Sequence, residues 1–116
     1  MKDIDLLNRT FSFAIRTIKA IRVFPDNTEL KVIKYQLIKS ATSVGANYEE
    51  AQAASSKADF THKVKIALKE ARESNYWLRM LAALNYNSDE LQLLIQESKE
   101  LKNILGAIVL KLSKES

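Results

Sequence analysis

Residues 30–51 read LKVIKYQLIKSATSVGANYEEA, and this stretch decides the fold. Its apolar side chains recur at steps of three and four residues, which places them along one face of an α-helix. They are Leu30, Ile33, Leu37, Ala41, Val44, Tyr48 and Ala51. A strand would bury every second residue instead, so the stretch predicts a long helix that packs this face into a core.

A row of polar residues, here called the polar seam, lies directly beside that face. It consists of Gln36, Ser40, Ser43, Asn47 and Glu50. Much of the seam is small and uncharged, whereas the polar face of a surface helix usually carries Lys and Glu. Two interpretations stay open: hydrogen bonding that fixes helix register inside the core, and a contact between subunits.

Outward from this stretch the chain predicts three more helices, at about 5–24, 57–85 and 89–113, with the central one at 28–55. Pro25 disfavours helical geometry at Phe24, Thr28 and Ser56 are expected N-caps, and Asn85 to Ser88 form a turn. Short connections make consecutive helices antiparallel. The predicted fold is an all-α, up-down-up-down four-helix bundle, with residues 1–116 as one domain.

The other three helices also carry apolar stripes. For the first we expect a core stripe of Leu7, Phe11, Ala14, Ile18 and Ile21. For the third it is Phe60, Val64, Ala67, Leu68, Ala71, Leu78 and Leu81, and for the fourth Leu91, Leu94, Ser98, Leu101, Leu105, Ile108 and Leu112. Gly45, inside a helix rich in small residues, predicts a close approach of two helix backbones.

The residues that catalysis or metal binding would need are missing. There is no cysteine, His62 is the single histidine, and neither a G-x-S-x-G elbow nor a phosphate-binding glycine loop occurs. Glu50 and Glu70 are better interpreted as buried ion-pair partners than as an acid–base pair. We therefore expect no catalytic residue, no metal and no cofactor. The absence of a long apolar run or signal peptide predicts a cytoplasmic protein with no membrane association.

Charge is distributed unevenly along the chain. The net charge is +4, yet residues 1–25 and 57–87 hold the excess of cations, while the two remaining quarters are each −1. Complementary charges between neighbouring helices would explain this pattern, and so would a surface for nucleic acid.

Two basic stripes are the candidates for such a surface. The third helix carries Lys65, Lys69, Arg72 and Arg79, with Tyr76 between the last two, and the first helix carries Arg9 and Arg16. Cations interleaved with an aromatic ring suit a phosphate backbone with occasional base stacking. Solvated faces of surface helices have the same composition, so both interpretations stay open. Trp77 is expected to anchor the core.

Residues 36–51, QLIKSATSVGANYEEA, and 57–78, KADFTHKVKIALKEARESNYWL, together resemble the bacterial 23S rRNA intervening-sequence protein family. The similarity covers most of the chain. The family's polar pattern falls on Gln36, Ser40, Ser43, Asn47, Glu50 and Glu70 of this sequence.

The resemblance implies a four-helix protomer that assembles into a homopentamer and has no established catalytic activity. The family is similar to the accessory protein of diversity-generating retroelements, a basic pentamer that binds its reverse transcriptase and nucleic acid. The expected partners are thus other copies of the chain, with RNA or DNA. In the alternative, a protein such as a reverse transcriptase is the main partner and the chain is an interaction scaffold.

Overall fold

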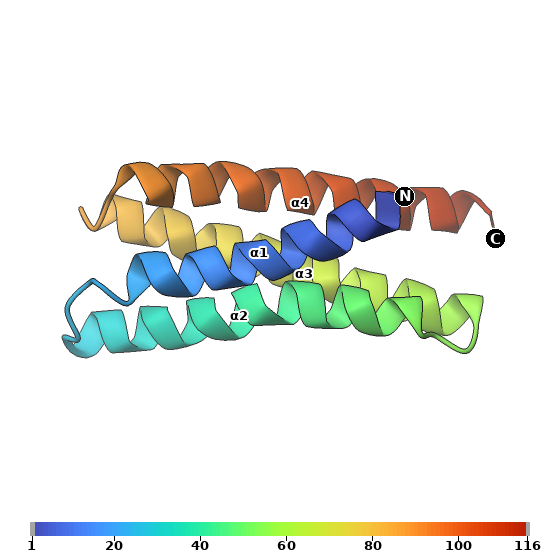
Figure 1. Cartoon of the computed structure of the whole chain (residues 1–116), viewed down its shortest axis with the longest axis horizontal. Helices are drawn as coiled ribbons and strands as arrows, with labels where there is room; N and C mark the ends of the chain where they lie inside the picture. The colour runs from blue at the N-terminus through green and yellow to red at the C-terminus, as the bar shows by residue number, and fades with distance from the viewer. Residues whose placement is uncertain (1, 116) are drawn as a thin grey trace.

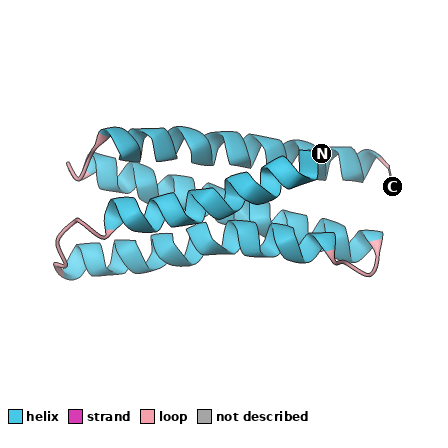
Figure 2. Cartoon of the chain, viewed as in Figure 1, coloured by secondary structure: helices cyan, strands magenta, loops and turns pink. Residues whose placement is uncertain are grey.

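The computed structural model describes residues 2–115, which form four helices (Figure 1). They are α1 (Lys2–Ile21), α2 (Thr28–Gln52), α3 (Lys57–Ala83) and α4 (Asp89–Lys114). Consecutive helices run in opposite directions in a rod of 46 × 22 × 21 Å. Figure 2 shows short loops between consecutive helices, and the described residues contain no strand. The predicted all-α four-helix bundle is confirmed.

Three helices begin at a side-chain cap. The Asn27 Oδ1, Ser56 Oγ and Ser88 Oγ atoms accept hydrogen bonds from the backbone N–H groups of Leu30, Asp59 and Leu91 at 2.9, 3.0 and 3.0 Å. These bonds satisfy donors that the first turn of a helix leaves without partners. The expectation of Thr28 as a cap was wrong by one residue, because the amide of Asn27 already occupies that role.

The helix ends also differ slightly from the sequence pattern. α1 ends at Ile21, three residues before the predicted Phe24, and Phe24 instead packs its ring 5.7 Å from that of Tyr86. After α3, Asn85 adopts a φ of 71°, and Tyr86 N–H donates to the Leu81 carbonyl at 3.0 Å. This is a Schellman ending, in which asparagine takes the left-handed position that glycine usually fills. It explains the predicted turn.

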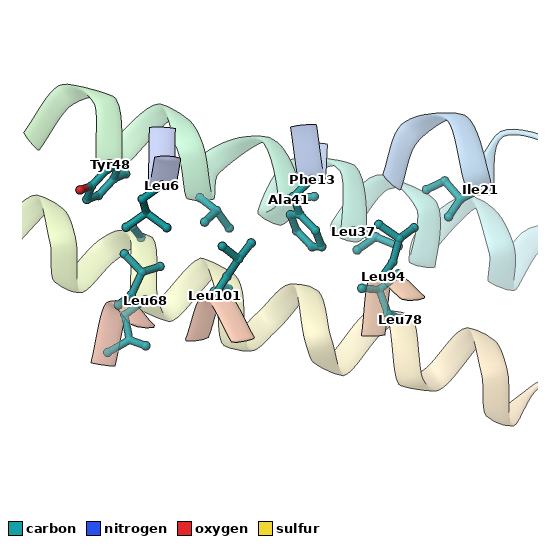
Figure 3. Close-up of a cluster of buried hydrophobic side chains, with 14 of the residues drawn as sticks. Leu6, Phe13, Ile21, Leu37, Ala41, Tyr48, Leu68, Leu78, Leu94 and Leu101 are labelled. Carbon is teal, nitrogen blue, oxygen red and sulfur yellow. The ribbon is translucent and has the colours of Figure 1, made fainter. Parts of the chain in front are cut away.

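The core lies along the axis that the four helices share. Every residue of the predicted apolar face of α2 is buried, and so are the first five residues of the predicted α4 stripe. Figure 3 shows side chains from all four helices meeting there, among them Leu6, Leu37, Leu78 and Leu101. The predicted stripes of α2 and α4 therefore position these helices as expected.

The expected core stripe of α1 was wrong by about one residue. The row that is buried is Leu6, Thr10, Phe13, Thr17 and Ile21, whereas Phe11 is 67% exposed. Contacts on both sides fix this rotation. Thr10 faces Gly45 of α2, and Arg9 reaches carboxylates of α4. The core row of α1 lies between those two contacts, so two threonines are buried and the phenylalanine is left outside.

The close approach predicted at Gly45 is confirmed. A Cβ atom built on Gly45 would lie 3.0 Å from the Thr10 Oγ1 atom and 3.2 Å from the Thr10 carbonyl carbon. Any side chain at this position would push α1 away from α2.

Candidate nucleic-acid interface

The outward face of α3 has one sign of charge. Between positions 62 and 79 its exposed residues are His62, Lys65, Lys69, Arg72, Tyr76 and Arg79, and none of them is acidic. Among the side chains of residues 5–115, no carboxylate lies within 4.0 Å of the cationic groups of Lys65, Lys69, Arg72 or Arg79. These four cations are therefore available to an external anion. We call them, with Tyr76, the α3 stripe.

The C-terminal half of the α3 stripe is organised around Tyr76. The guanidinium carbon of Arg79 lies 6.0 Å from the centre of the Tyr76 ring, and the Trp77 ring meets that of Tyr76 edge-on, with centroids 5.0 Å apart. The Arg79 Nε atom donates to Asn75 Oδ1 at 2.8 Å, and Asn75 Nδ2 in turn donates to Ser98 Oγ of α4 at 2.9 Å. Part of the stripe is thus tied to the bundle. Trp77 packs half-buried against the core, as expected.

The predicted site residues of α1 have a different environment. The Arg9 guanidinium donates to both carboxylate oxygens of Glu97, at 2.9 and 2.7 Å, and to Glu100 at 2.9 Å. Arg16 Nε donates to Glu90 at 2.9 Å. These bonds raise the pKa of Arg9, with the Glu97 hydrogen bond as the largest cause, and Gln96 together with Arg9 lowers the pKa of Glu100. The structure therefore places Arg9 and Arg16 on a different surface from the α3 stripe, as links between α1 and α4.

The polar seam lies where α2 meets α3. Ser40 is buried, and its Oγ accepts a hydrogen bond of 2.9 Å from the Ser74 hydroxyl of α3. Ser43 and Asn47 are half-buried and donate to carbonyls of their own helix, those of Lys39 and Ser43, both at 2.8 Å. Gln36 is half-buried and Glu50 is exposed. One seam residue thus bonds across the bundle, while the others lie at its edge.

Glu70 lies on the side of α3 that faces the polar seam. Burial raises the pKa of its carboxyl group, and the neighbouring Glu73 raises it further, while Lys69 and Lys39 act in the opposite direction. The family's polar pattern on Gln36 to Glu50 and the one on Glu70 therefore meet at the α2–α3 junction, and not on the α3 stripe.

Sequence reasoning missed two cations on α4. Asn75 contacts Ser98, and Leu68 lies 4.0 Å from a Cβ atom built on Gly106, so the antiparallel register sets Lys102 at the level of Arg72. Lys99 lies about one turn before Lys102 in α4 and is exposed. The net charge of residues 88–116 hides this pair, because it also counts Glu90, Glu97 and Glu100, which bond to arginines of α1. The available signal in the sequence was that Lys99 and Lys102 are three residues apart, which places them on neighbouring turns of one helix face.

An apolar groove of about 320 Å³ lies between α1 and α2. Leu7, Phe11, Ile15 and Ile18 form one wall, while Gly45 and Ala46 belong to the small residues on the other side. The exposed Phe11 side chain therefore stands beside a hollow on the same face of the molecule.

A larger hollow of about 680 Å³ lies at the end of the bundle where α1 begins and α4 ends. Leu6, Phe60, Ile108 and Leu112 line it with Tyr48, and charged residues at its edge include Arg9, Lys111 and Glu115. α1 has 20 residues and α4 has 26, a difference of about 9 Å at 1.5 Å per residue. The stripe of α4 thus continues where α1 does not cover it.

Among the side chains that the structure describes, those of residues 5–115, no group of three or more His, Asp or Glu is placed to hold a metal ion. In the same range, none of the helices combines the length and the apolarity that crossing a membrane requires.

A family model for the 23S rRNA-intervening sequence protein matches residues 2–107. The chain belongs to this family. A crystal structure of a protein of unknown function from the S23 ribosomal protein family of Bacteroides thetaiotaomicron is similar, with 37% identity and a TM-score of 0.82. The match covers 94% of this chain and 98% of that chain. Among curated proteins, none matches the chain. The resemblance predicted from residues 36–51 and 57–78 is confirmed, and the matched range places both the α3 stripe and the polar seam inside the region that defines the family.

Proposed function

We propose that this family member is a non-enzymatic, homo-oligomeric protein that binds nucleic acid through the α3 stripe, as a cytoplasmic accessory factor linked to rRNA intervening sequences. One observation carries the proposal: every exposed position of α3 from 62 to 79 is basic, histidine or tyrosine, and its four Lys and Arg side chains have no carboxylate partner in the described structure. Unpaired cations in a row are suited to the phosphates of a nucleic acid backbone.

α3 is a better candidate than α1 because of what surrounds each set of cations. A phosphate approaching Arg9 or Arg16 would compete with Glu97 or Glu90 for a guanidinium that already makes charge-assisted hydrogen bonds. A phosphate approaching Lys69 or Arg72 displaces only water. Arg9 and Arg16 enter the proposal as secondary contacts.

Assembly would strengthen a modest patch. Each chain has a net charge of +4, so a pentamer would carry about +20, and linked weak contacts act at high effective concentration. Support for self-association comes from the α1–α2 groove, where the exposed Phe11 of one copy is a suitable occupant for the hollow of the next. An exposed aromatic ring beside an apolar hollow is a surface that another copy of the chain could cover.

The test compares two double charge reversals. Lys69→Glu/Arg72→Glu removes the centre of the α3 stripe. Lys19→Glu/Arg22→Glu changes the net charge equally, at an exposed position of α1 and at the exposed residue that follows its last turn. α1 packs against α2 and α4 and lies diagonally across from α3. We expect retention on mixed RNA and DNA at low salt to fall strongly for the first variant and much less for the second.

The salt dependence gives a sharper measurement. Four phosphate contacts on a single strand predict a slope of log K against log salt of about −3, and Lys69→Ala/Arg72→Ala should reduce its magnitude by about 1.4. Absence of binding by the wild type at low salt, or equal effects of both reversals, would contradict the proposal. Native mass spectrometry of the wild type comes first, since a monomer would remove the multiplication of charge.

One observation favours a second candidate function, that of a scaffold whose main partner is another protein. The hollow at the end of the bundle is apolar at its base and charged at its edge, as protein-binding grooves are. Under this alternative, Ile108→Glu would abolish capture of a partner without changing nucleic acid retention. The α3 reversals would then leave partner capture intact.

A further inference from the structure

Tyr76 interrupts the cations of the α3 stripe next to Arg79, where the stripe is bonded to the rest of the bundle. It stands four residues after Arg72 and three before Arg79, on the same face of the helix, and its side chain is 47% exposed. In a row that serves only to hold phosphates, a cation would be expected at this position. Phosphate binding alone therefore does not explain an aromatic ring at this position.

The ring is also held in place before any ligand arrives. Trp77 meets it edge-on at 5.0 Å, and Arg79 lies against it while bonded to Asn75, which is itself anchored to Ser98. Because its neighbours already restrict the side chain, little conformational entropy remains to be lost on binding. A fixed, half-exposed aromatic ring flanked by guanidinium groups is a stacking surface for a nucleobase.

The shape of the bundle then selects the kind of nucleic acid. The α3 stripe runs along the outer face of one helix and extends over about 21 Å, from Lys65 to Arg79, at 1.5 Å per residue. Bases inside a duplex are stacked on each other and cannot reach a ring on such a surface, whereas an unpaired base can turn outward. A flexible strand can also follow a straight row of cations, over a site of roughly four to six nucleotides.

We propose that the α3 stripe takes single-stranded nucleic acid and that one unpaired base stacks on Tyr76. This inference rests on the proposed function, since it assumes that the stripe binds nucleic acid, and it adds the strand state and the residue that recognises it. Trp77, the single tryptophan of the chain, is in contact with the stacking ring and reports on the event.

The experiment measures binding of a mixed-sequence 12-nucleotide single strand, and of the same sequence as a duplex, at low salt. The variants are Tyr76→Leu, which removes the ring, and Tyr76→Phe, which keeps it. Tyr35→Leu is the control, because Tyr35 of α2 is also exposed and stands between Lys31 and Lys39. We expect Tyr76→Leu to weaken single-strand binding roughly fivefold or more, with duplex binding nearly unchanged. Tyr76→Phe and Tyr35→Leu should bind like the wild type.

Tryptophan fluorescence gives the second readout. Titration with the single strand should change the emission of Trp77 in the wild type and in Tyr76→Phe, and the duplex should change it little. If Tyr76→Leu loses affinity for strand and duplex equally, or loses none while Lys69→Glu/Arg72→Glu abolishes binding, the stacking inference is wrong and the proposed function stands. If the wild type binds neither probe, both are wrong.

Discussion

Gly45 shows at the scale of one residue how tightly this bundle is packed. Alanine there would gain about 1 kcal/mol of helix propensity. However, its Cβ atom would meet the backbone of Thr10 at 3.2 Å, and backbone cannot move aside as a flexible side chain can. We predict that Gly45→Ala lowers the free energy of unfolding by about 1–2 kcal/mol, measured by urea denaturation.

Gly106 is the matched control, because its nearest contact for a new Cβ atom is Leu68 Cδ1 at 4.0 Å, an ordinary van der Waals distance. Gly106→Ala should therefore stabilise the protein, by up to about 1 kcal/mol. The same Gly→Ala substitution is thus predicted to change the free energy of unfolding in opposite directions in α2 and α4. A stabilising Gly45→Ala would show that α1 can move away from α2 at little cost.

Individual residues of the polar seam have different roles. Ser40 bonds to Ser74 across the bundle, whereas Asn47 bonds to a carbonyl of its own helix. We predict that Ser40→Ala lowers the unfolding free energy of the protomer by about 1 kcal/mol and leaves assembly unchanged. Asn47→Leu should change protomer stability by less than that and shift the assembly state. Chemical denaturation and native mass spectrometry measure the two effects, and normal assembly of Asn47→Leu would count against a subunit contact there.

At the scale of a helix, the side of α3 that faces α2 carries a partly buried carboxyl group, that of Glu70, whose charged form is disfavoured by burial. Because burial raises the pKa of Glu70 in the folded state, the folded protein binds this proton more tightly than the unfolded chain does. The contribution of Glu70 to stability is therefore most favourable below its ordinary pKa of 4.5 and is lost as the pH rises through the folded pKa.

Replacing the carboxyl group by an amide should remove this pH dependence. We predict that Glu70→Gln is more stable than the wild type at neutral pH and that the difference disappears below about pH 4. Thermal or urea unfolding over pH 3–8 measures it, with Glu50→Gln, at an exposed seam position, as the control. A wild type and a Glu70→Gln variant with parallel pH profiles would show that Glu70 carries no such penalty.

The helices also show how far sequence could predict this structure and where it could not. α2 has a single apolar face, so its periodicity places all seven of its core residues. α1 has two adjacent rows that both read as apolar or neutral, and periodicity alone selects the one with Phe11. The burial of Thr10 and Thr17 depends on Gly45 and Glu97, which lie far away in the sequence. The α3 stripe was visible as spacing, but the partners that occupy Arg9 and Arg16 were not.

At the scale of the whole molecule, the cations of the two basic helices have different surroundings. Arg9 and Arg16 of α1 turn towards carboxylates of α4, whereas the cations of the α3 stripe turn to solvent, with Lys102 of α4 at the level of Arg72. Complementary charge between helices therefore accounts for Arg9 and Arg16, whereas the α3 stripe keeps the cations of the proposed nucleic-acid surface free of carboxylates. The net charge of the chain cannot separate them, because it sums over two opposite arrangements.

Assembly would repeat the α3 stripe, and the strength of binding should therefore depend on the subunit contact. We predict that Phe11→Glu shifts the protein to smaller species in native mass spectrometry and leaves its helical content unchanged, since Phe11 is exposed and outside the core. Leu93→Glu is the control, because Leu93 of α4 is 59% exposed but lies outside the α1–α2 groove. It should assemble like the wild type.

If the α3 stripe binds as a repeated surface, Phe11→Glu must also weaken binding to a long single strand far more than to a 12-nucleotide one, because only the long strand can engage several copies. Equal losses on both lengths would place Phe11 in the binding surface itself, and an unchanged assembly state would exclude this groove as the subunit contact.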